Sequence, residues 1–223
     1  RLDDGLKRII LLESKGGVFG DPAWEAVAKN DCGKPSSRTL ALDAAHESMT
    51  LLKNQNNVLP LSKNAKVLVA GPSAQSISAL NGCWSYTWQG KEEHWYPADS
   101  KTIFQAISDK LGVANVTTST AKGFDNVINY DAAKLTAAVA NVDAIILCVG
   151  EDAYAESPGN TCELALPDNQ IELAKAAAVT GKPVILVLTE GRPRFITSIE
   201  PSMKGILMTY WSGKKTAEAI ADV

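Results

Sequence analysis

Ala144-Ile145-Ile146-Leu147-Cys148-Val149 and Val184-Ile185-Leu186-Val187-Leu188 are two short runs made only of apolar residues. Such runs are typical of strands in a parallel sheet whose two faces are both covered by helices. Between them lies a segment with helical features: Pro167 and Asp168 suit its amino end, and Gly181 suits its carboxyl end. A strand, a helix and a strand in this order predict a doubly wound α/β fold.

The same alternation extends on both sides of these two strands. The expected strands are Lys66–Ala70, Val113–Thr118, Ala144–Val149, Val184–Thr189 and Gly205–Thr209. The expected helices of this region are Thr102–Leu111, Asp131–Asn141, Pro167–Val179 and Lys214–Val223. The sequence therefore predicts a mostly parallel sheet of about five to six strands with helices on both faces.

The first 62 residues follow a different pattern. Residues 1–15 predict an amphipathic helix that Gly16-Gly17 ends, and a polar stretch at residues 30–35 indicates a linker. The apolar side chains on one face of this helix are Leu2, Leu6, Ile9 and Ile10. A second helix is expected from Ser36 or Ser37, as its cap, to about Leu52. Its inward-facing side chains are expected to be Leu40, Ala44, Ser48 and Leu51.

Composition excludes several classes of function. The net charge of −3 gives no support for nucleic acid or an anionic membrane as a partner. No apolar run reaches the ~18–20 residues that a membrane-spanning helix needs. The chain begins with Arg1, and its last expected helix has neither a cap nor a following strand, so we expect an excerpt of a longer protein.

The cysteines indicate no metal centre. They are scattered along the chain, at Cys32, Cys83, Cys148 and Cys162. They form no CxxC pair, and only His46 and His94 are available to help them bind zinc. No metal or other cofactor is therefore predicted. A disulfide between Cys83 and Cys162 stays open, and so does the redox compartment.

Two connections are too long to be simple turns, and both follow the carboxyl ends of expected strands. Asn81–Ser100 is rich in aromatic residues, and Gly150–Leu166 is rich in carboxylates. The aromatic residues are Trp84, Tyr86, Trp88, Trp95 and Tyr96, and the carboxylates are Glu151, Asp152, Glu156 and Glu163. Ligands of open α/β sheets bind beyond the carboxyl ends of strands, so we expect the functional site between these connections.

The residues alone leave the role of each side chain open. Glu156 lies in a turn-forming stretch that projects it outward, where it is either a reactive acid or an idle solvated carboxylate. Glu151, directly after a strand, is suited to structural hydrogen bonds with loop amides. Trp84 and Trp88 either present their rings to a ligand or pack beneath the loop. A nucleotide-binding domain is disfavoured, because residues 71–74, Gly-Pro-Ser-Ala, are no phosphate-binding glycine motif.

Ordered blocks along nearly the whole chain resemble glycoside hydrolase family 3, in its β-glucosidase and exo-β-glucanase branch. The blocks lie at residues 1–9, 47–54, 59–61, 66–72, 82–90, 149–160, 166–170, 181–188 and 191–193. Among them are Gly-Cys-Trp-Ser-Tyr-Thr-Trp-Gln-Gly at 82–90 and Tyr-Ala-Glu-Ser-Pro-Gly-Asn at 154–160. Each block is short, but their order and spacing together are specific to this family.

The resemblance implies an (α/β)6 sandwich domain joined to a barrel domain. Residues 1–22 then correspond to the last helix and exit of the barrel, residues 23–62 to an interdomain linker with a helix, and residues 63–223 to the C-terminal sandwich domain, incomplete at its end. The barrel domain of the same enzyme would supply the nucleophile, an aspartate with no counterpart in this chain. This chain alone is therefore expected to be inactive.

The resemblance also assigns roles to three side chains. Glu156 matches the general acid/base of a retaining enzyme, which protonates the leaving oxygen and then deprotonates the attacking water. Trp88 matches one wall of the +1 sugar subsite, and Trp84 lines the same cleft. The implied protein is a secreted or periplasmic β-glucosidase that acts from chain ends on β-linked gluco-oligosaccharides. A non-catalytic carbohydrate-binding module that uses the same tryptophans is the alternative.

Overall fold

The computed structural model describes residues 1–20, 33–119, 123–125, 127 and 130–223. Residues 23–32 of the expected linker, with Cys32, lie outside this part of the chain. The chain divides into two compact units, residues 1–40 and 41–223. The first contains helix α1 (Leu2–Lys15), which buries none of its residues. The expected helix is confirmed, and all its apolar side chains are exposed.

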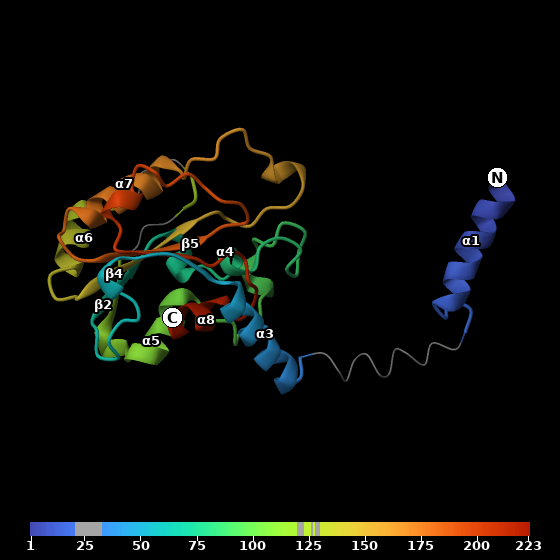
Figure 1. Ribbon diagram of the computed structural model, residues 1–223, viewed down its shortest axis with the longest axis horizontal. Coiled ribbons are helices and arrows are strands. Elements are labelled where there is room, and N and C mark those ends of the chain that lie inside the picture. Colours follow the sequence, from blue (N-terminus) through green and yellow to red (C-terminus); the bar gives the residue numbers. More distant parts are fainter. Residues whose placement is uncertain (21–32, 120–122, 126, 128–129) are drawn as a thin grey trace. The chain divides into compact units, whose positions relative to one another are not determined.

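A six-stranded sheet organises the second unit (Figure 1). Its strands are β1 (Thr50–Asn54), β2 (Val67–Ala70), β3 (Val116–Ser119), β4 (Ala144–Gly150), β5 (Val184–Thr189) and β6 (Gly205–Met208). They lie in the order β1-β6-β5-β4-β2-β3, and only the pairing of β1 with β6 is antiparallel. The predicted fold, a mostly parallel sheet of α/β type, is confirmed.

Helices cover both faces of the sheet (Figure 1). Helices α6 (Ala132–Ala138) and α7 (Asp168–Ala178) lie on one face, and α5 (Ile103–Leu111) and α8 (Thr216–Asp222) lie on the other. The other α-helices in the described part of the chain are α3 (Pro35–Ser48) and the short α4 (Ser78–Asn81). Single 3₁₀ turns occur at Gln55–Asn57, Pro72–Gln75, Glu93–Trp95, Val113–Asn115, Ser157–Gly159 and Glu200–Ser202.

Strand β4 shows why a wholly apolar sequence belongs at the centre of such a sheet. All seven of its residues are buried. Ile145, Leu147 and Val149 join the core beneath α6 and α7, whereas Ile146 and Cys148 join the core beneath α5 and α8. Because side chains alternate between the faces of a strand, a strand covered on both sides needs apolar residues at every position.

Several boundaries differ from the prediction. The second helix begins at Pro35, ahead of Ser36 and Ser37, so neither serine is its cap. The second helix ends at Ser48 instead of Leu52, because Thr50–Asn54 form β1. This strand pairs with β6 and provides partners for backbone N–H and C=O groups that would otherwise be unpaired at the edge of the sheet. The expected inward face of the helix is also wrong: Leu40, Ala44, Ser48 and Leu51 are exposed, and Ala45 is the buried residue of the helix. Val113–Asn115 form a 3₁₀ turn before β3, and Pro167 caps α7 without being its first residue.

The strand order reverses its direction between β2 and β4. The chain runs outward from β2 to β3, returns to β4 beside β2, and continues to β5 and β6 on the other side. This reversal is a topological switch point, the place where open α/β sheets bind ligands. The two long connections come after β2 and β4, beyond their carboxyl ends, so the fold brings both to this switch point, as predicted.

Gly150, at the carboxyl end of β4, fits only as glycine. Its φ is +143°, and a Cβ there would lie 2.0 Å from the backbone oxygen of Thr189 in β5. We expect Gly150→Ala to destabilise the protein by more than about 3 kcal/mol, because backbone strain and overlap add together. Denaturant unfolding measures this effect.

Gly181→Ala is the matched control. Gly181 also has a positive φ, +78°, but a Cβ added there would meet no atom within 4 Å. This variant should lose only the ~1–2 kcal/mol cost of the left-handed conformation. Equal losses in the two variants would contradict the close approach of β4 and β5.

Candidate active site

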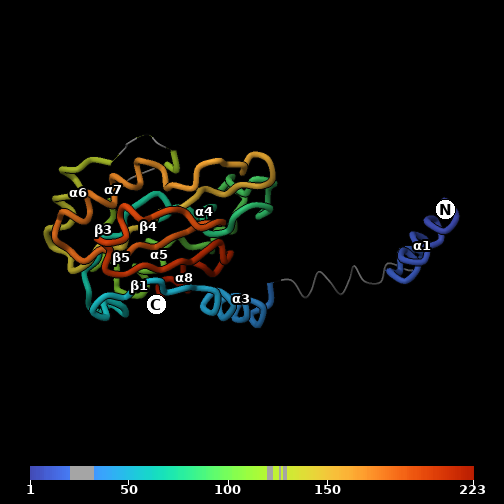
Figure 2. Tube along the Cα trace, turned by 45° about the horizontal axis from the view of Figure 1, so that its top comes forward, coloured from blue at the N-terminus to red at the C-terminus, as the bar shows by residue number. Residues whose placement is uncertain are grey.

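Two loops lie side by side at the carboxyl ends of the parallel strands (Figure 1, Figure 2). We call residues 82–90 the tryptophan loop and residues 151–163 the acidic loop. The side chain of Gln89 joins them: Ala155 N donates to Gln89 Oε1 (3.0 Å), and Gln89 Nε2 donates to Ala155 O (3.2 Å). An ion pair between Lys91 Nζ and Asp152 Oδ2 (3.0 Å) adds a second contact. The fold therefore holds the two predicted loops together.

Glu156 directly follows the Ala155 residue that Gln89 holds. It is exposed, and its backbone has φ +54° and ψ −139°, a conformation that non-glycine residues rarely adopt. Its carbonyl accepts a hydrogen bond from Gly159 N (2.9 Å), and the Gly159 carbonyl accepts one from Arg192 Nη2 (2.7 Å). Such strain persists only where the surroundings fix it, and it concentrates at functional sites.

The indoles of the tryptophan loop face solvent. Trp84 is 68% exposed and Trp88 is 46% exposed, so neither is packed beneath the loop. Trp84 N donates to Trp88 O (3.0 Å), which closes the loop between them. The loop is supported by Tyr96, whose buried hydroxyl donates to Gly90 O (2.8 Å). Exposed indole faces can stack on the apolar face of a ligand.

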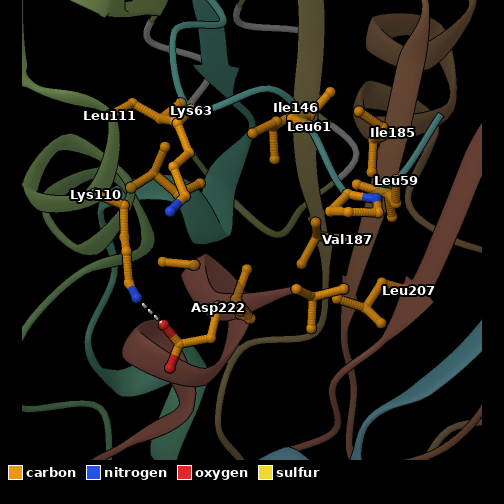
Figure 3. A pocket seen from close by; sticks show the side chains of 15 residues that line it. Leu59, Leu61, Lys63, Lys110, Leu111, Ile146, Ile185, Val187, Leu207 and Asp222 are labelled. Carbon is orange, nitrogen blue, oxygen red and sulfur yellow. Dashed lines mark ion pairs between the residues drawn. The ribbon is translucent and has the colours of Figure 1, made fainter.

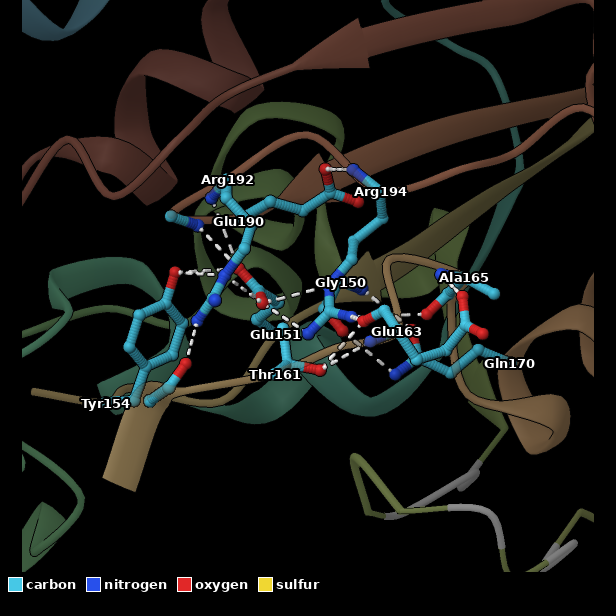
Figure 4. Close-up of polar contacts among 12 residues, drawn as sticks. Gly150, Glu151, Tyr154, Thr161, Glu163, Ala165, Gln170, Glu190, Arg192 and Arg194 are labelled. Atoms are coloured by element: carbon cyan, nitrogen blue, oxygen red, sulfur yellow. Dashed lines mark hydrogen bonds and ion pairs between the residues drawn. The ribbon is translucent and has the colours of Figure 1, made fainter. Parts of the chain in front are cut away.

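Glu151 anchors the base of the acidic loop (Figure 4). Its side chain is 4% exposed. Its Oε2 accepts from Gly191 N (3.1 Å) and Arg192 N (3.2 Å), and its Oε1 accepts from Arg194 Nε (2.9 Å). The expected structural role of Glu151, hydrogen bonding to loop amides, is confirmed. A buried carboxylate needs such partners, because an unpaired one would be very costly.

The aromatic support behind this anchor was not predicted from any sequence pattern. Arg192 lies 4.0 Å from the centre of the Tyr154 ring and donates from Nε to its hydroxyl (2.7 Å). Trp211, from the segment after β6, meets the same ring edge-on at 4.7 Å. Burial, with the nearby charge of Glu151, raises the pKa of Tyr154. The motif Gly191-Arg192-Pro193 carried part of the resemblance but did not reveal this contact.

Comparison with known families decides to which family this chain belongs. Residues 49–223 match the model described as the glycosyl hydrolase family 3 C-terminal domain. The chain belongs to glycoside hydrolase family 3. It is 34% identical to a lysosomal beta glucosidase of Dictyostelium discoideum and 29% identical to a periplasmic beta-glucosidase of Salmonella typhimurium. Both matches span 100% of this chain but only 28% and 32% of the relatives.

A solved structure supports the same assignment. The beta-glucosidase of Listeria innocua in complex with glucose superposes with a TM-score of 0.85 at 29% identity. The match covers 99% of this chain and 29% of that protein. The six-stranded α/β layer described above is thus the fold of family 3 C-terminal domains.

Other candidate sites in this family 3 domain carry no comparable chemistry. Within the described residues no group of three or more His, Cys, Asp or Glu side chains could hold a metal ion, and no helix is long and apolar enough to cross a membrane. Cys83 and Cys162 are free thiols, so the bridge that the spacing left open is not formed.

A cavity of about 400 Å³ lies on the face of the sheet that α5 and α8 cover (Figure 3). Ile146, Ile185 and Val187 contribute to its apolar lining, and an ion pair between Lys110 and Asp222 lies at one side. None of Glu156, Trp84 and Trp88 lines it. Its lining offers no reactive pair, so the loops remain the candidate active site.

Glu190, directly after β5, is a second buried carboxyl near the anchor. Only 1% of it is exposed; its Oε2 accepts from Arg194 N (3.1 Å), and its Oε1 has no hydrogen-bond partner among the described residues. Burial raises the pKa of Glu190 from 4.5 to about 7, and the charge of Glu151 acts in the same direction. Below about pH 7 the folded protein therefore favours the protonated form of Glu190.

This carboxyl makes stability depend on pH. Because the folded-state pKa lies above the unfolded one, its contribution is full below about pH 4.5 and is lost as the pH rises through about 7. Glu190→Gln should remove that loss and be more stable at pH 8 by on the order of 3 kcal/mol, with little change at pH 4. Denaturant unfolding at several pH values measures the difference, and exposed Glu47→Gln is the control. A difference that does not vary with pH would contradict this assignment.

The strained backbone of Glu156 predicts a conflict between stability and function. Glycine adopts this conformation without the ~1–3 kcal/mol of backbone strain that another residue has there. Part of this stabilisation is lost, because glycine also raises the conformational entropy of the unfolded chain. Glu156→Gly should therefore be about 1 kcal/mol more stable than Glu156→Gln, its matched control. Chemical denaturation of the two variants makes the comparison. A glycine variant that is the less stable of the two would show that the position is unstrained.

Proposed function

We propose that this chain supplies the acid/base carboxyl and the aromatic sugar-contacting residues of a retaining β-glucosidase. The carrying observation is the location of Glu156: it lies on an exposed, strained turn that Gln89 ties to the tryptophan loop, at the switch point of the sheet. The proposed reaction is hydrolysis of β-linked gluco-oligosaccharides from their ends. The two relatives and the solved structure described above are beta-glucosidases, and on these we base the choice of glucose. Other similar proteins are named beta-xylosidases.

In the proposed mechanism Glu156 acts twice. It first donates its proton to the glycosidic oxygen as that bond breaks, and a glycosyl–enzyme intermediate forms on the nucleophile. Glu156, now a carboxylate, then removes a proton from the water that releases the sugar. Because Glu156 is exposed at a loop tip, it can reach both a substrate oxygen and solvent.

A retaining mechanism needs a second carboxyl roughly 5–5.5 Å from the first. Glu151 is unsuited to this role, because Arg194 and the amides of the following segment already occupy its oxygens. We place the nucleophile in a barrel domain of the same protein. In this scheme residues 1–22 form the exit of the barrel, residues 23–62 the linker with a helix, and residues 63–223 the C-terminal domain.

The exposed indoles would form the outer part of the sugar site. A pyranose presents C–H groups on its faces, and an indole face packs well against them. We assign Trp88 to one wall of the +1 subsite and Trp84 to the lining of the same cleft. With a sugar bound, the rings would also exclude water from Glu156.

One relative is named periplasmic and another lysosomal, which supports a secreted or periplasmic location.

A direct test replaces the acid. In the full-length enzyme, Glu156→Gln keeps the size of the side chain but removes the transferable proton, so kcat/KM for cellobiose should fall by roughly 10²–10⁴-fold. Glu172→Gln is the control, because Glu172 lies on helix α7, where it pairs with Lys175. It should leave the rate unchanged.

The same assay separates the enzyme from a non-catalytic carbohydrate-binding module. If the full-length protein binds gluco-oligosaccharides and hydrolyses none, the domain is a non-catalytic carbohydrate-binding module. If it hydrolyses them and Glu156→Gln retains the full rate, another group is the acid.

A further inference from the structure

We propose that Gln89 is a positioning residue for the acid/base, which sets the place of Glu156 relative to the Trp88 wall. This inference rests on the proposed function of Glu156. Gln89 directly follows Trp88 in the chain, and its side chain binds the residue directly before Glu156. One side chain therefore connects both groups that would contact the substrate.

The contact has the geometry of a paired peptide. The Gln89 amide accepts from Ala155 N at 3.0 Å and donates to Ala155 O at 3.2 Å, so it satisfies both backbone groups of that residue. Ala155 is only 3% exposed, and its backbone would lose both partners without this amide. The side-chain amides of asparagine and glutamine carry a donor and an acceptor in this arrangement whatever the pH.

Gln170 makes the same kind of contact at the start of the acidic loop. Its amide accepts from Gly150 N (2.8 Å) and donates to Gly150 O (3.0 Å). The loop is thus fixed at its base by Gln170 and Glu151, and close to Glu156 by Gln89. The Gln170 contact lies within the layer of β4 and α7, whereas the Gln89 contact comes from the opposite loop.

A second contact, between Lys91 directly after the tryptophan loop and Asp152 of the acidic loop, is weaker. The side chains of Lys91 and Asp152 are 48% and 31% exposed, and solvent screens an ion pair of that kind. Arg192 holds the far end of the turn through the Gly159 carbonyl, but it belongs to the segment after β5. Gln89, which is partly buried and makes two hydrogen bonds, is therefore the stronger link between the tryptophan loop and the strained turn of Glu156.

The coupling matters most for substrates that need a proton. A misplacement of about 1 Å in a catalytic group can cost on the order of 100-fold in rate. An alkoxide leaving group needs protonation as it departs, whereas a dinitrophenolate leaves without it. Loss of Gln89 should therefore slow the two kinds of substrate to different extents, which general unfolding would not do.

The experiment compares cellobiose with 2,4-dinitrophenyl β-glucoside in the full-length enzyme. Gln89→Leu keeps the approximate volume and removes both hydrogen bonds, and we expect kcat/KM for cellobiose to fall about 100-fold. For the dinitrophenyl substrate we expect a change of less than about threefold. Gln89→Glu, which retains the acceptor for Ala155 N, should show the same selectivity with a smaller loss and serves as the readout if the leucine variant does not fold.

Gln75→Leu is the matched control, because it removes a different side-chain amide bond, from Gln75 Nε2 to Thr118 Oγ1 (3.1 Å). It should leave both rates unchanged. Equal losses on both substrates for the Gln89 variants, or no loss, would overturn the inference. Glu156→Gln is assayed in parallel. If this variant does not lose more kcat/KM on cellobiose than on the dinitrophenyl substrate, the proposed function of Glu156 fails, whatever the Gln89 variants show.

Discussion

The site depends on the hydrogen bonds that the buried carboxylate of Glu151 accepts. This carboxylate is almost fully removed from solvent, yet it accepts hydrogen bonds from the Gly191 and Arg192 amides and from the Arg194 guanidinium. These bonds join the acidic loop after β4 to the segment after β5. A charge in this place is tolerable only when every partner is present, so the anchor also fixes the geometry of both segments.

The position of Glu156 follows from this anchor and from the sheet. Strands β2 and β4 are adjacent and parallel, so the segments that follow them leave the sheet at the same edge. Glu151 and Gln170 fix the start of the acidic loop there. Gln89 then holds the loop close to its tip. The backbone of Glu156 is strained because the chain on both sides of it is held in place, by Gln89 at Ala155 and by Arg192 at Gly159, while its own side chain is exposed.

Much of the fold was predictable from the sequence because strands buried on both faces must be apolar throughout, as β4 and β5 are. The second helix was misjudged because Thr50–Asn54 pair with a distant strand, and local periodicity cannot register such a pairing. The roles of Gln89 and Arg192 were also beyond sequence reasoning, since each depends on a carbonyl or ring brought near by the fold. The role of Glu156 came from resemblance and stays a prediction.

The central claim, that Glu156 is the acid/base of a retaining enzyme, is tested most directly by trapping the intermediate with azide. In full-length Glu156→Ala with 2,4-dinitrophenyl β-glucoside, azide needs no base to attack the glycosyl–enzyme. Added azide should therefore restore turnover and yield the β-glucosyl azide, which the wild-type enzyme should not accumulate. An alanine variant that turns over at the wild-type rate, or that gains nothing from azide and forms no glucosyl azide, would contradict the account.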